Sequence, residues 1–184
     1  MKKIITTGMV LLSAEMISCH SRPAPVRLYC CEKEGTGTAS GITTPHDASV
    51  YQLPGTWTYQ HGRPLTLNEL KGKVRIVAMV FTHCGYACPR IVQDMKAIED
   101  SLPAQEKEEV GYVLVSFDVE RDDPVQLARY AAWQGLDDRW TLLHGSAGQV
   151  RELSMLLNVR YQPTGDGSFS HTNTILILDR NGNI

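Results

Sequence analysis

The sequence predicts an α/β domain built on a largely parallel sheet. Two continuous runs of apolar β-forming residues, 74–81 and 110–117, have the composition of strands that are buried on both faces. Other segments carry apolar residues at spacings of three and four, the pattern of helices that pack on a sheet. Strands that alternate with helices favour parallel pairing, because each helix returns the chain to the start of the next strand.

The first element expected is an N-terminal β-hairpin. Residues 49–53 and 56–60 are short alternating runs on either side of Pro54-Gly55, and residues 61–64 have the composition of a turn.

The helices and the remaining strands follow in alternation. A helix is expected from about Cys88 to Leu102, and a second from about Pro124 to Trp133. Proline suits the first position of a helix, because the backbone N–H that it lacks has no hydrogen-bond partner within the helix there. Three further segments are expected as a strand, a helix and a strand, at residues 140–143, 146–157 and 174–178.

The end of the sequence favours a thioredoxin-like fold. Residues 179–183, Asp-Arg-Asn-Gly-Asn, are a strong turn signal that adds an antiparallel hairpin to the parallel strands. In that fold a partner strand and a closing helix follow, whereas this sequence stops at Ile184. We interpret it as a fragment that lacks them, because an exposed strand edge beside half a hairpin is a liability. A sheet that closes in another way is the alternative.

The N-terminal residues predict export. Two lysines precede an apolar stretch, and a serine stands directly before Cys19. The pattern predicts a signal peptide of the lipoprotein type over residues 1–18, with Cys19 as the acylated N-terminus. An ordinary signal peptide or an uncleaved anchor is the alternative. Residues 19–48 lack periodicity and predict a flexible linker to a domain over residues 49–184.

Charge and cysteine content restrict the function further. The net charge of -2 includes no basic excess, so nothing indicates a nucleic-acid partner. After Cys19, four cysteines remain in two local groups, too few for a disulfide-built scaffold. Cys30 and Cys31 are neighbours in the linker, where a mutual disulfide would be strained. Two alternatives remain for Cys30 and Cys31: they have no role, or they take part in redox chemistry or in the transfer of a metal ion.

Cys84, Cys88 and His171 are the candidate metal ligands. The cysteines lie four residues apart at the start of a helix, directly after a buried strand. Residues four apart share one helical face, so both sulfurs can converge, and the helix N-terminus favours thiolates. His171 follows a loop over residues 164–170 that can carry it over the cysteines. Two thiolates and an imidazole suit copper, whereas structural zinc usually takes four protein ligands. A structural disulfide and an ordinary loop histidine are the alternatives, and His83 is expected to point away.

These residues resemble the SCO/SenC family, the proteins for synthesis of cytochrome c oxidase. The resemblance extends from about Val50 to the end of the chain. Its segments are Tyr51-Gln52-Leu53, Trp57, Gly72-Lys73, Thr82 to Pro89 with the pattern Thr-x-Cys-x-x-x-Cys-Pro, Met95-Lys96, residues 116–124, Trp140, and Gly167 to His171.

The resemblance implies an exported, membrane-attached domain of thioredoxin-like fold that faces the periplasm. It implies Cu(I) and Cu(II) binding by Cys84, Cys88 and His171. It also implies that Asp118 lies near the metal without binding it directly, with capping of a loop as the alternative for that residue. The implied partner is the copper-receiving subunit of cytochrome c oxidase, or another cuproprotein, and the implied membrane contact is a lipid anchor.

Three activities remain open on these residues. The favoured one is a copper metallochaperone that supports assembly of the binuclear copper centre of cytochrome c oxidase. The second is a thiol-disulfide oxidoreductase, or alternatively a redox sensor. In the oxidoreductase, Cys84 would attack a disulfide of the partner and Cys88 would resolve the mixed disulfide, although the spacing of the two cysteines differs from the usual Cys-x-x-Cys. The third, a thiol peroxidase, needs one activated cysteine beside a threonine and an arginine. Whether the protein is an enzyme therefore stays undecided.

Overall fold

The computed structural model describes residues 49–184, and they form the expected α/β architecture. The strands are β1 (Trp57–Tyr59), β2 (Pro64–Leu65), β3 (Val74–Val80), β4 (Val110–Ser116), β5 (Trp140–His144), β6 (Tyr161–Pro163), β7 (Phe169–His171) and β8 (Ile175–Leu178). The helices are η2 (Val50–Gln52), η3 (Leu67–Leu70), α1 (Ala87–Ser101), α2 (Ala104–Lys107), α3 (Pro124–Gln134) and α4 (Ala147–Leu156).

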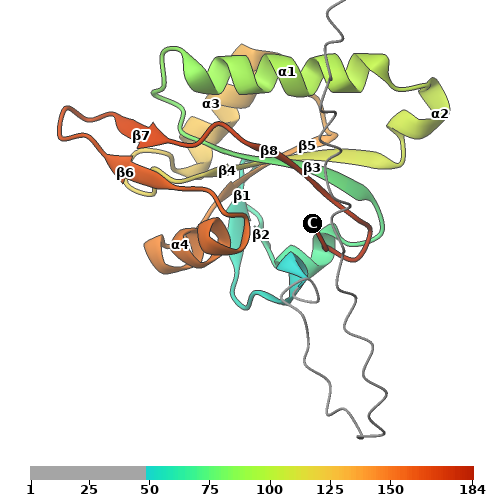
Figure 1. Cartoon of the computed structure of the whole chain (residues 1–184), viewed down its shortest axis with the longest axis horizontal. Helices are drawn as coiled ribbons and strands as arrows, with labels where there is room; N and C mark the ends of the chain where they lie inside the picture. The colour runs from blue at the N-terminus through green and yellow to red at the C-terminus, as the bar shows by residue number, and fades with distance from the viewer. Residues whose placement is uncertain (1–48) are drawn as a thin grey trace, which may run out of the picture. The chain divides into compact units, whose positions relative to one another are not determined.

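The main sheet has six strands in the order β2-β1-β5-β4-β3-β8. Strands β3, β4 and β5 are parallel, and β1, β2 and β8 run antiparallel to their neighbours. The steps from β3 to β4 and from β4 to β5 cross the sheet in one direction, so right-handed connections place α1 and α3 on the same face. The chain then returns toward β8, and α4 covers the opposite face (Figure 1).

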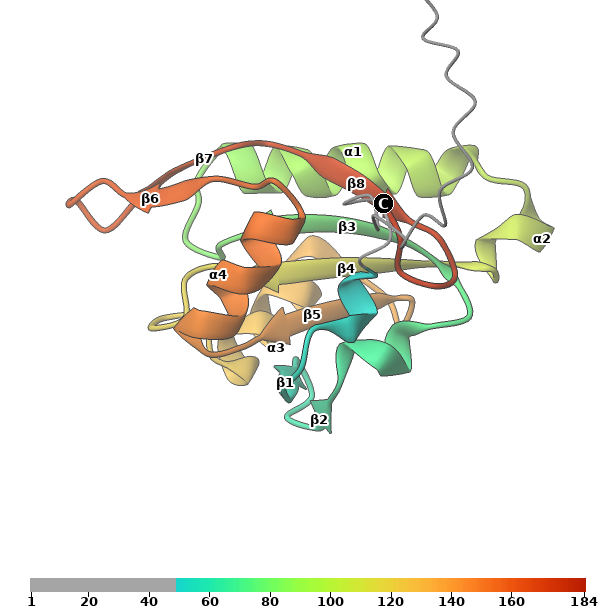
Figure 2. The ribbon, with the colours of Figure 1, turned by 60° about the horizontal axis from the view of Figure 1, so that its bottom comes forward.

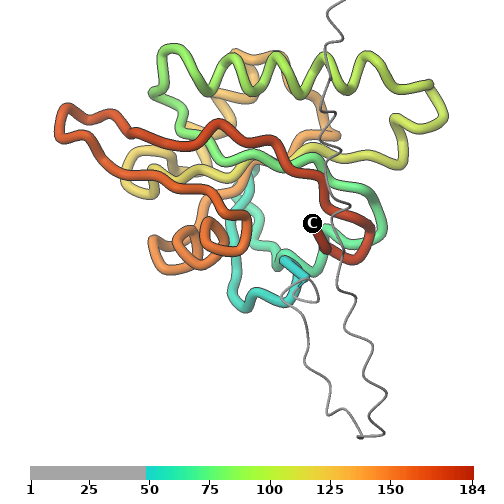
Figure 3. Tube along the Cα trace, in the orientation of Figure 1, coloured from blue at the N-terminus to red at the C-terminus, as the bar shows by residue number. Residues whose placement is uncertain are grey.

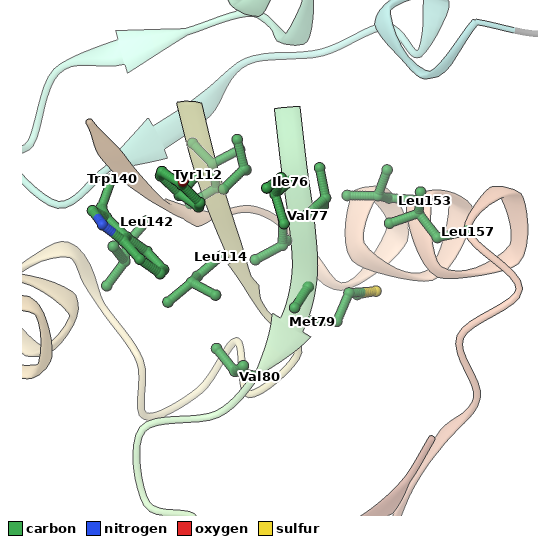
Figure 4. Packing of buried hydrophobic residues seen from close by; sticks show 14 of the residues in the cluster. Ile76, Val77, Met79, Val80, Tyr112, Leu114, Trp140, Leu142, Leu153 and Leu157 are labelled. Atoms are coloured by element: carbon green, nitrogen blue, oxygen red, sulfur yellow. The ribbon is translucent and has the colours of Figure 1, made fainter. Parts of the chain in front are cut away.

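The parallel strands lie at the centre of the core. Their residues are buried on both faces of the sheet, which is why they appear in the sequence as continuous apolar runs. The rings of Tyr112 and Trp140 stack across neighbouring strands with centroids 4.6 Å apart. Figure 4 shows these rings beside Leu142, with Leu153 and Leu157 facing the sheet from the α4 side.

The N-terminal hairpin is present, but its strands differ from those expected. Residues 49–53 were expected to form a strand, and they contain η2 instead. Ser49 caps this turn through its side chain, and the Val50 N–H donates to the Gly182 carbonyl at 2.9 Å rather than to a strand. The hairpin consists of β1 and β2, joined across the turn that contains Gly62 at a φ of 78°.

The C-terminal part adds a second, two-stranded sheet of β6 and β7, which extends beyond the main sheet (Figures 2 and 3). The expected turn after β8 is confirmed, because the Asp179 N–H donates to the Asn183 carbonyl at 2.8 Å. None of the helices in residues 49–184 combines the length and apolar character that crossing a membrane requires.

Candidate metal centre

The turn between β3 and α1 positions the two cysteines. The Phe81 N–H donates to Cys88 Sγ at 3.4 Å, and the Cys84 N–H donates to the Phe81 carbonyl at 3.3 Å. The Cys88 N–H in turn donates to Cys84 Sγ at 3.3 Å. Helix α1 begins only at Ala87, so Cys84 lies in the turn before it. The expectation that both cysteines share a helical face is therefore wrong, and the sulfurs converge because the turn folds back on the helix end.

His171 reaches the cysteines from the β6–β7 hairpin. Its Nε2 lies 3.8 Å from Cys88 Sγ, and its Nδ1 lies 3.2 Å from the Thr172 carbonyl. When Nδ1 donates a proton to that carbonyl, the lone pair of Nε2 is free to bind a metal. The ring packs against those of Phe81 and Phe117, at centroid distances of 6.0 and 5.1 Å.

The segment that carries His171 differs from the expected loop. Residues 164–170 were interpreted as a loop directly before the last strand, but β7 begins at Phe169 and includes His171. Thr172, Asn173 and Thr174 then separate β7 from β8. Pairing of Tyr161 with His171 in the hairpin explains why the imidazole has a defined position.

The spacing of the three donor atoms suits one soft metal ion. Cys84 Sγ, Cys88 Sγ and a ring nitrogen of His171 all lie within 4.8 Å of one another. A planar three-coordinate ion, with bonds of about 2.3 Å to sulfur and about 2.0 Å to nitrogen, separates these donor types by about 3.7 Å. The observed 3.8 Å between Cys88 Sγ and His171 Nε2 matches that separation. Thiolate and imidazole donors are those that copper and zinc prefer.

The two thiols differ in their environment. Burial raises the pKa of Cys84, but hydrogen bonds from the backbone of Cys88, Tyr86 and Ala87 and from the Cys88 side chain outweigh it, so this pKa is lowered. Burial raises the pKa of Cys88 far above its ordinary value, and the nearby charges of Cys84 and Asp122 add to the effect. Cys84 is the more accessible thiolate, and Cys88 is fully buried at 0% exposure.

Asp122 is a functional candidate that sequence reasoning missed. Its carboxylate is 0% exposed and accepts hydrogen bonds from the Thr82 N–H (2.8 Å), the Thr82 hydroxyl (2.6 Å) and the Ser116 hydroxyl (2.6 Å). It thereby ties the β4–α3 loop to the start of the cysteine turn. Its position after a buried parallel strand was the available signal, since such strand ends share one edge of the sheet.

Asp118, the acidic residue expected near the metal, is buried but already paired. Its carboxylate accepts from the Arg121 guanidinium and from the Arg121 N–H. His83, Asp118 and Asp122 have potential ligand atoms within 4.8 Å of one another. Because both carboxylates are engaged by hydrogen-bond donors, this group forms a polar network beside the cysteine turn rather than an open metal site.

The other histidines of the described residues contact groups other than the three donor atoms, and two histidines lie outside the described range. The His144 Nδ1 contacts the Asp122 carbonyl at 3.0 Å, and the His61 ring packs on Tyr59. His20 and His46 fall outside residues 49–184, as do the predicted signal peptide over residues 1–18, the linker over residues 19–48, and Cys19, Cys30 and Cys31.

A hollow of about 440 Å³ adjoins the site beside the β6–β7 hairpin. Its apolar lining includes Phe117, Tyr161 and Phe169, and Arg121 lies with its guanidinium 5.9 Å from the Phe169 ring centroid. Tyr86, between the two cysteines, is 87% exposed. The candidate centre therefore lies next to an accessible surface.

Comparison with known proteins identifies one family. The family model described as SCO1/SenC matches residues 44–184. The SCO1 protein homolog of Bacillus subtilis is 29% identical over 135 residues, which cover 71% of this chain and 69% of that protein.

Solved structures of the same family are also similar. A SCO1/SenC family lipoprotein from Bacillus anthracis is 28% identical, with a TM-score of 0.63, over 70% of this chain and 78% of that one. The ScoI protein of Bradyrhizobium japonicum, solved with copper bound, is 26% identical, with a TM-score of 0.61, over 70% of this chain and 82% of that one.

Proposed function

Because this chain belongs to the SCO1/SenC family, we propose that it is a copper metallochaperone that holds Cu(I) or Cu(II) through Cys84, Cys88 and His171. The observation that carries the proposal is the convergence of two sulfurs and one imidazole nitrogen within 4.8 Å. The relative from Bradyrhizobium japonicum, solved with copper bound, supports copper as the metal. Copper is here the cargo of the protein.

Transfer of the cargo follows from the open coordination. Three protein ligands leave room for a thiolate of the recipient to bind the ion before any ligand leaves. Cys84 is partly exposed and lies in a turn, so we propose that it is the first to be exchanged. Cys88 and His171, held by α1 and the hairpin, then release the ion.

The recipient proposed is the binuclear copper centre of cytochrome c oxidase, or another cuproprotein outside the cytoplasm. The domain would act in the cell envelope, attached to the membrane through a lipid on Cys19. The lipoprotein relative from Bacillus anthracis supports this arrangement.

The test is copper binding by the reduced protein and by three variants. One copper per chain is expected, with a thiolate-to-Cu(II) charge-transfer band in the absorption spectrum. Cys84→Ala and His171→Ala should both lose the band, whereas His61→Ala, on the remote N-terminal hairpin, should keep it. A band that survives in His171→Ala would exclude this histidine as a ligand.

A second function, thiol-disulfide exchange, is favoured by the asymmetry of the two thiols. The Cys84 thiolate would attack a disulfide of the partner, form a mixed disulfide with one partner sulfur and release the other as a thiolate. Cys88, after losing its proton to that thiolate, would then attack the Cys84 sulfur, which releases the partner's second sulfur as a thiolate and leaves a Cys84–Cys88 disulfide. Reduction of a partner disulfide by a protein that binds no copper would favour this function. Loss of copper binding in His171→Ala with unchanged disulfide reduction would separate the two.

A further inference from the structure

The carboxylate of Asp122 is a buried negative charge without a buried cationic partner. The guanidinium of Arg121, the next residue, is directed to Asp118 instead. Among residues 49–184 the one basic side chain within 4 Å of the carboxylate is that of His83, which is half-exposed and whose Nδ1 lies 3.5 Å from the Asp122 Oδ1. Burial of a carboxylate is costly unless hydrogen bonds or charges compensate for it, and here three hydrogen bonds do so.

This charge lies close to the sulfur of Cys88. Thr82, which donates its N–H to Asp122, directly follows Phe81, which donates its N–H to Cys88 Sγ at 3.4 Å. Neighbouring amide nitrogens are within about 4 Å of each other, so the carboxylate and the sulfur are separated by no more than about 10 Å. Both groups are buried, and salt screens such an interaction weakly.

We propose that the Asp122 carboxylate shifts the preference of the centre toward Cu(II) over Cu(I). The inference rests on the proposed function. Cu(II) carries one more positive charge than Cu(I), so a fixed negative charge stabilises it more. At a separation of about 10 Å and an effective dielectric constant of about 20, one unit of charge changes a binding constant by roughly tenfold.

Asp122→Asn isolates the charge from the hydrogen bonds. In the wild-type protein the Thr82 N–H and the Ser116 hydroxyl both donate to the same carboxylate oxygen of Asp122. In the variant, the Asn Oδ1 can take the place of that oxygen and accept both hydrogen bonds. The Asn amide group then takes the place of the other oxygen and donates to the Thr82 hydroxyl, which can rotate and accept. The number of hydrogen bonds is kept while the charge is removed.

Two control variants separate charge from position. Thr82→Val keeps the Asp122 charge but removes one of its hydrogen bonds. Glu99→Gln removes the charge of a buried carboxylate that is paired with Arg139, about 16 Å farther along α1 than Cys88. Both should keep the wild-type ratio of Cu(II) to Cu(I) affinity.

The experiment measures the affinity of each variant for Cu(II) and for Cu(I), by competition with chelators of known affinity. Thermal unfolding of the copper-free proteins serves as the test of folding. Asp122→Asn should fold normally and lower the Cu(II)-to-Cu(I) affinity ratio about tenfold. An unchanged ratio, an equal loss for both ions, or the same change of ratio in Thr82→Val would overturn the inference. A wild-type protein that binds neither ion would instead overturn the proposed function, and this inference with it.

Discussion

At the scale of single residues, the two cysteines of the centre have unequal roles because their surroundings differ. Cys88 belongs to the first turn of α1 and is fully buried beside Phe81. Cys84 lies in the preceding turn, where backbone N–H groups stabilise its thiolate and solvent reaches it. In the proposed function, Cys84 would be the entry point for an exchanging partner and Cys88 would be the fixed ligand.

This difference predicts selective alkylation of the copper-free, reduced protein. Iodoacetamide reacts with thiolates, so Cys84 should be modified at least tenfold faster than Cys88 near neutral pH. Because the pKa of Cys84 is lowered, its thiolate persists to lower pH, and its reaction should slow only below the pH at which an ordinary thiol slows. Peptide mapping by mass spectrometry measures both rates. Equal alkylation rates of the two cysteines in the native protein would contradict the burial of Cys88. In denaturant, as a control, the two cysteines should be alkylated at equal rates.

At the scale of elements, the β6–β7 hairpin is the part that completes the centre. It is separate from the main sheet, and its aromatic side chains anchor it to the sheet edge. Phe169 packs on Phe81 and Phe117, at centroid distances of 5.1 and 5.2 Å, and His171 follows it on the same strand. Alternate residues of a strand point to the same face, so Phe169 and His171 approach the cysteine turn together.

Removal of the anchor should loosen the histidine without unfolding the domain. Phe169→Ala should weaken Cu(II) binding by about tenfold or more, because His171 must then be ordered at the moment of binding. Ser170→Ala, on the exposed face of the same strand, is the matched control and should bind as the wild type does. Circular dichroism checks the fold, and a Cu(II) titration checks the affinity. Equal affinities of the two variants would show that the hairpin holds His171 without Phe169.

At the scale of the whole molecule, the centre lies at the edge where the parallel strands end. The cysteine turn follows β3, the Asp122 loop follows β4, and the hairpin returns to the same edge before β8. Ligands separated by 83 residues in sequence come together there, between Cys88 and His171. Copper would therefore bind the folded state more tightly than the unfolded chain, in which His171 is not held beside the cysteines, so binding and folding are linked.

That linkage predicts a rise in thermal stability. Copper at 100 times its dissociation constant should stabilise the protein by about 2.7 kcal/mol. For a domain of this size, the melting temperature should then rise by roughly 10 °C. Differential scanning calorimetry with and without copper measures the shift, and Cys88→Ala should lose it. A similar rise in that variant would place the stabilising ion elsewhere in the chain.

Periodicity and composition were enough to predict the layered fold. Continuous apolar runs marked β3 and β4, and spacings of three and four marked α1 and α4, because burial of these segments imposes a regular pattern on each. Proline at the first helical position marked the start of α3. Short elements were predicted less well. Alternation over residues 49–53 indicated a strand, but a capped turn can bury the same apolar side chains. Contacts with the C-terminal turn decide in favour of the capped turn.

For the site, the sequence by itself determined the chemistry, and the tertiary structure decided the geometry. Cys84, Cys88 and His171 could be predicted as ligands from donor type, the cysteine spacing and the position of His171 before the last strand of a thioredoxin-like sheet, because few combinations of side chains suit a soft metal. Sequence could not distinguish Asp118 from Asp122, since both follow the same strand. Packing between β3, β4 and α3 decides that the Asp118 carboxylate is paired with Arg121 and that the Asp122 carboxylate lies buried against the cysteine turn. Such packing joins residues about 40 positions apart, beyond the reach of any local pattern.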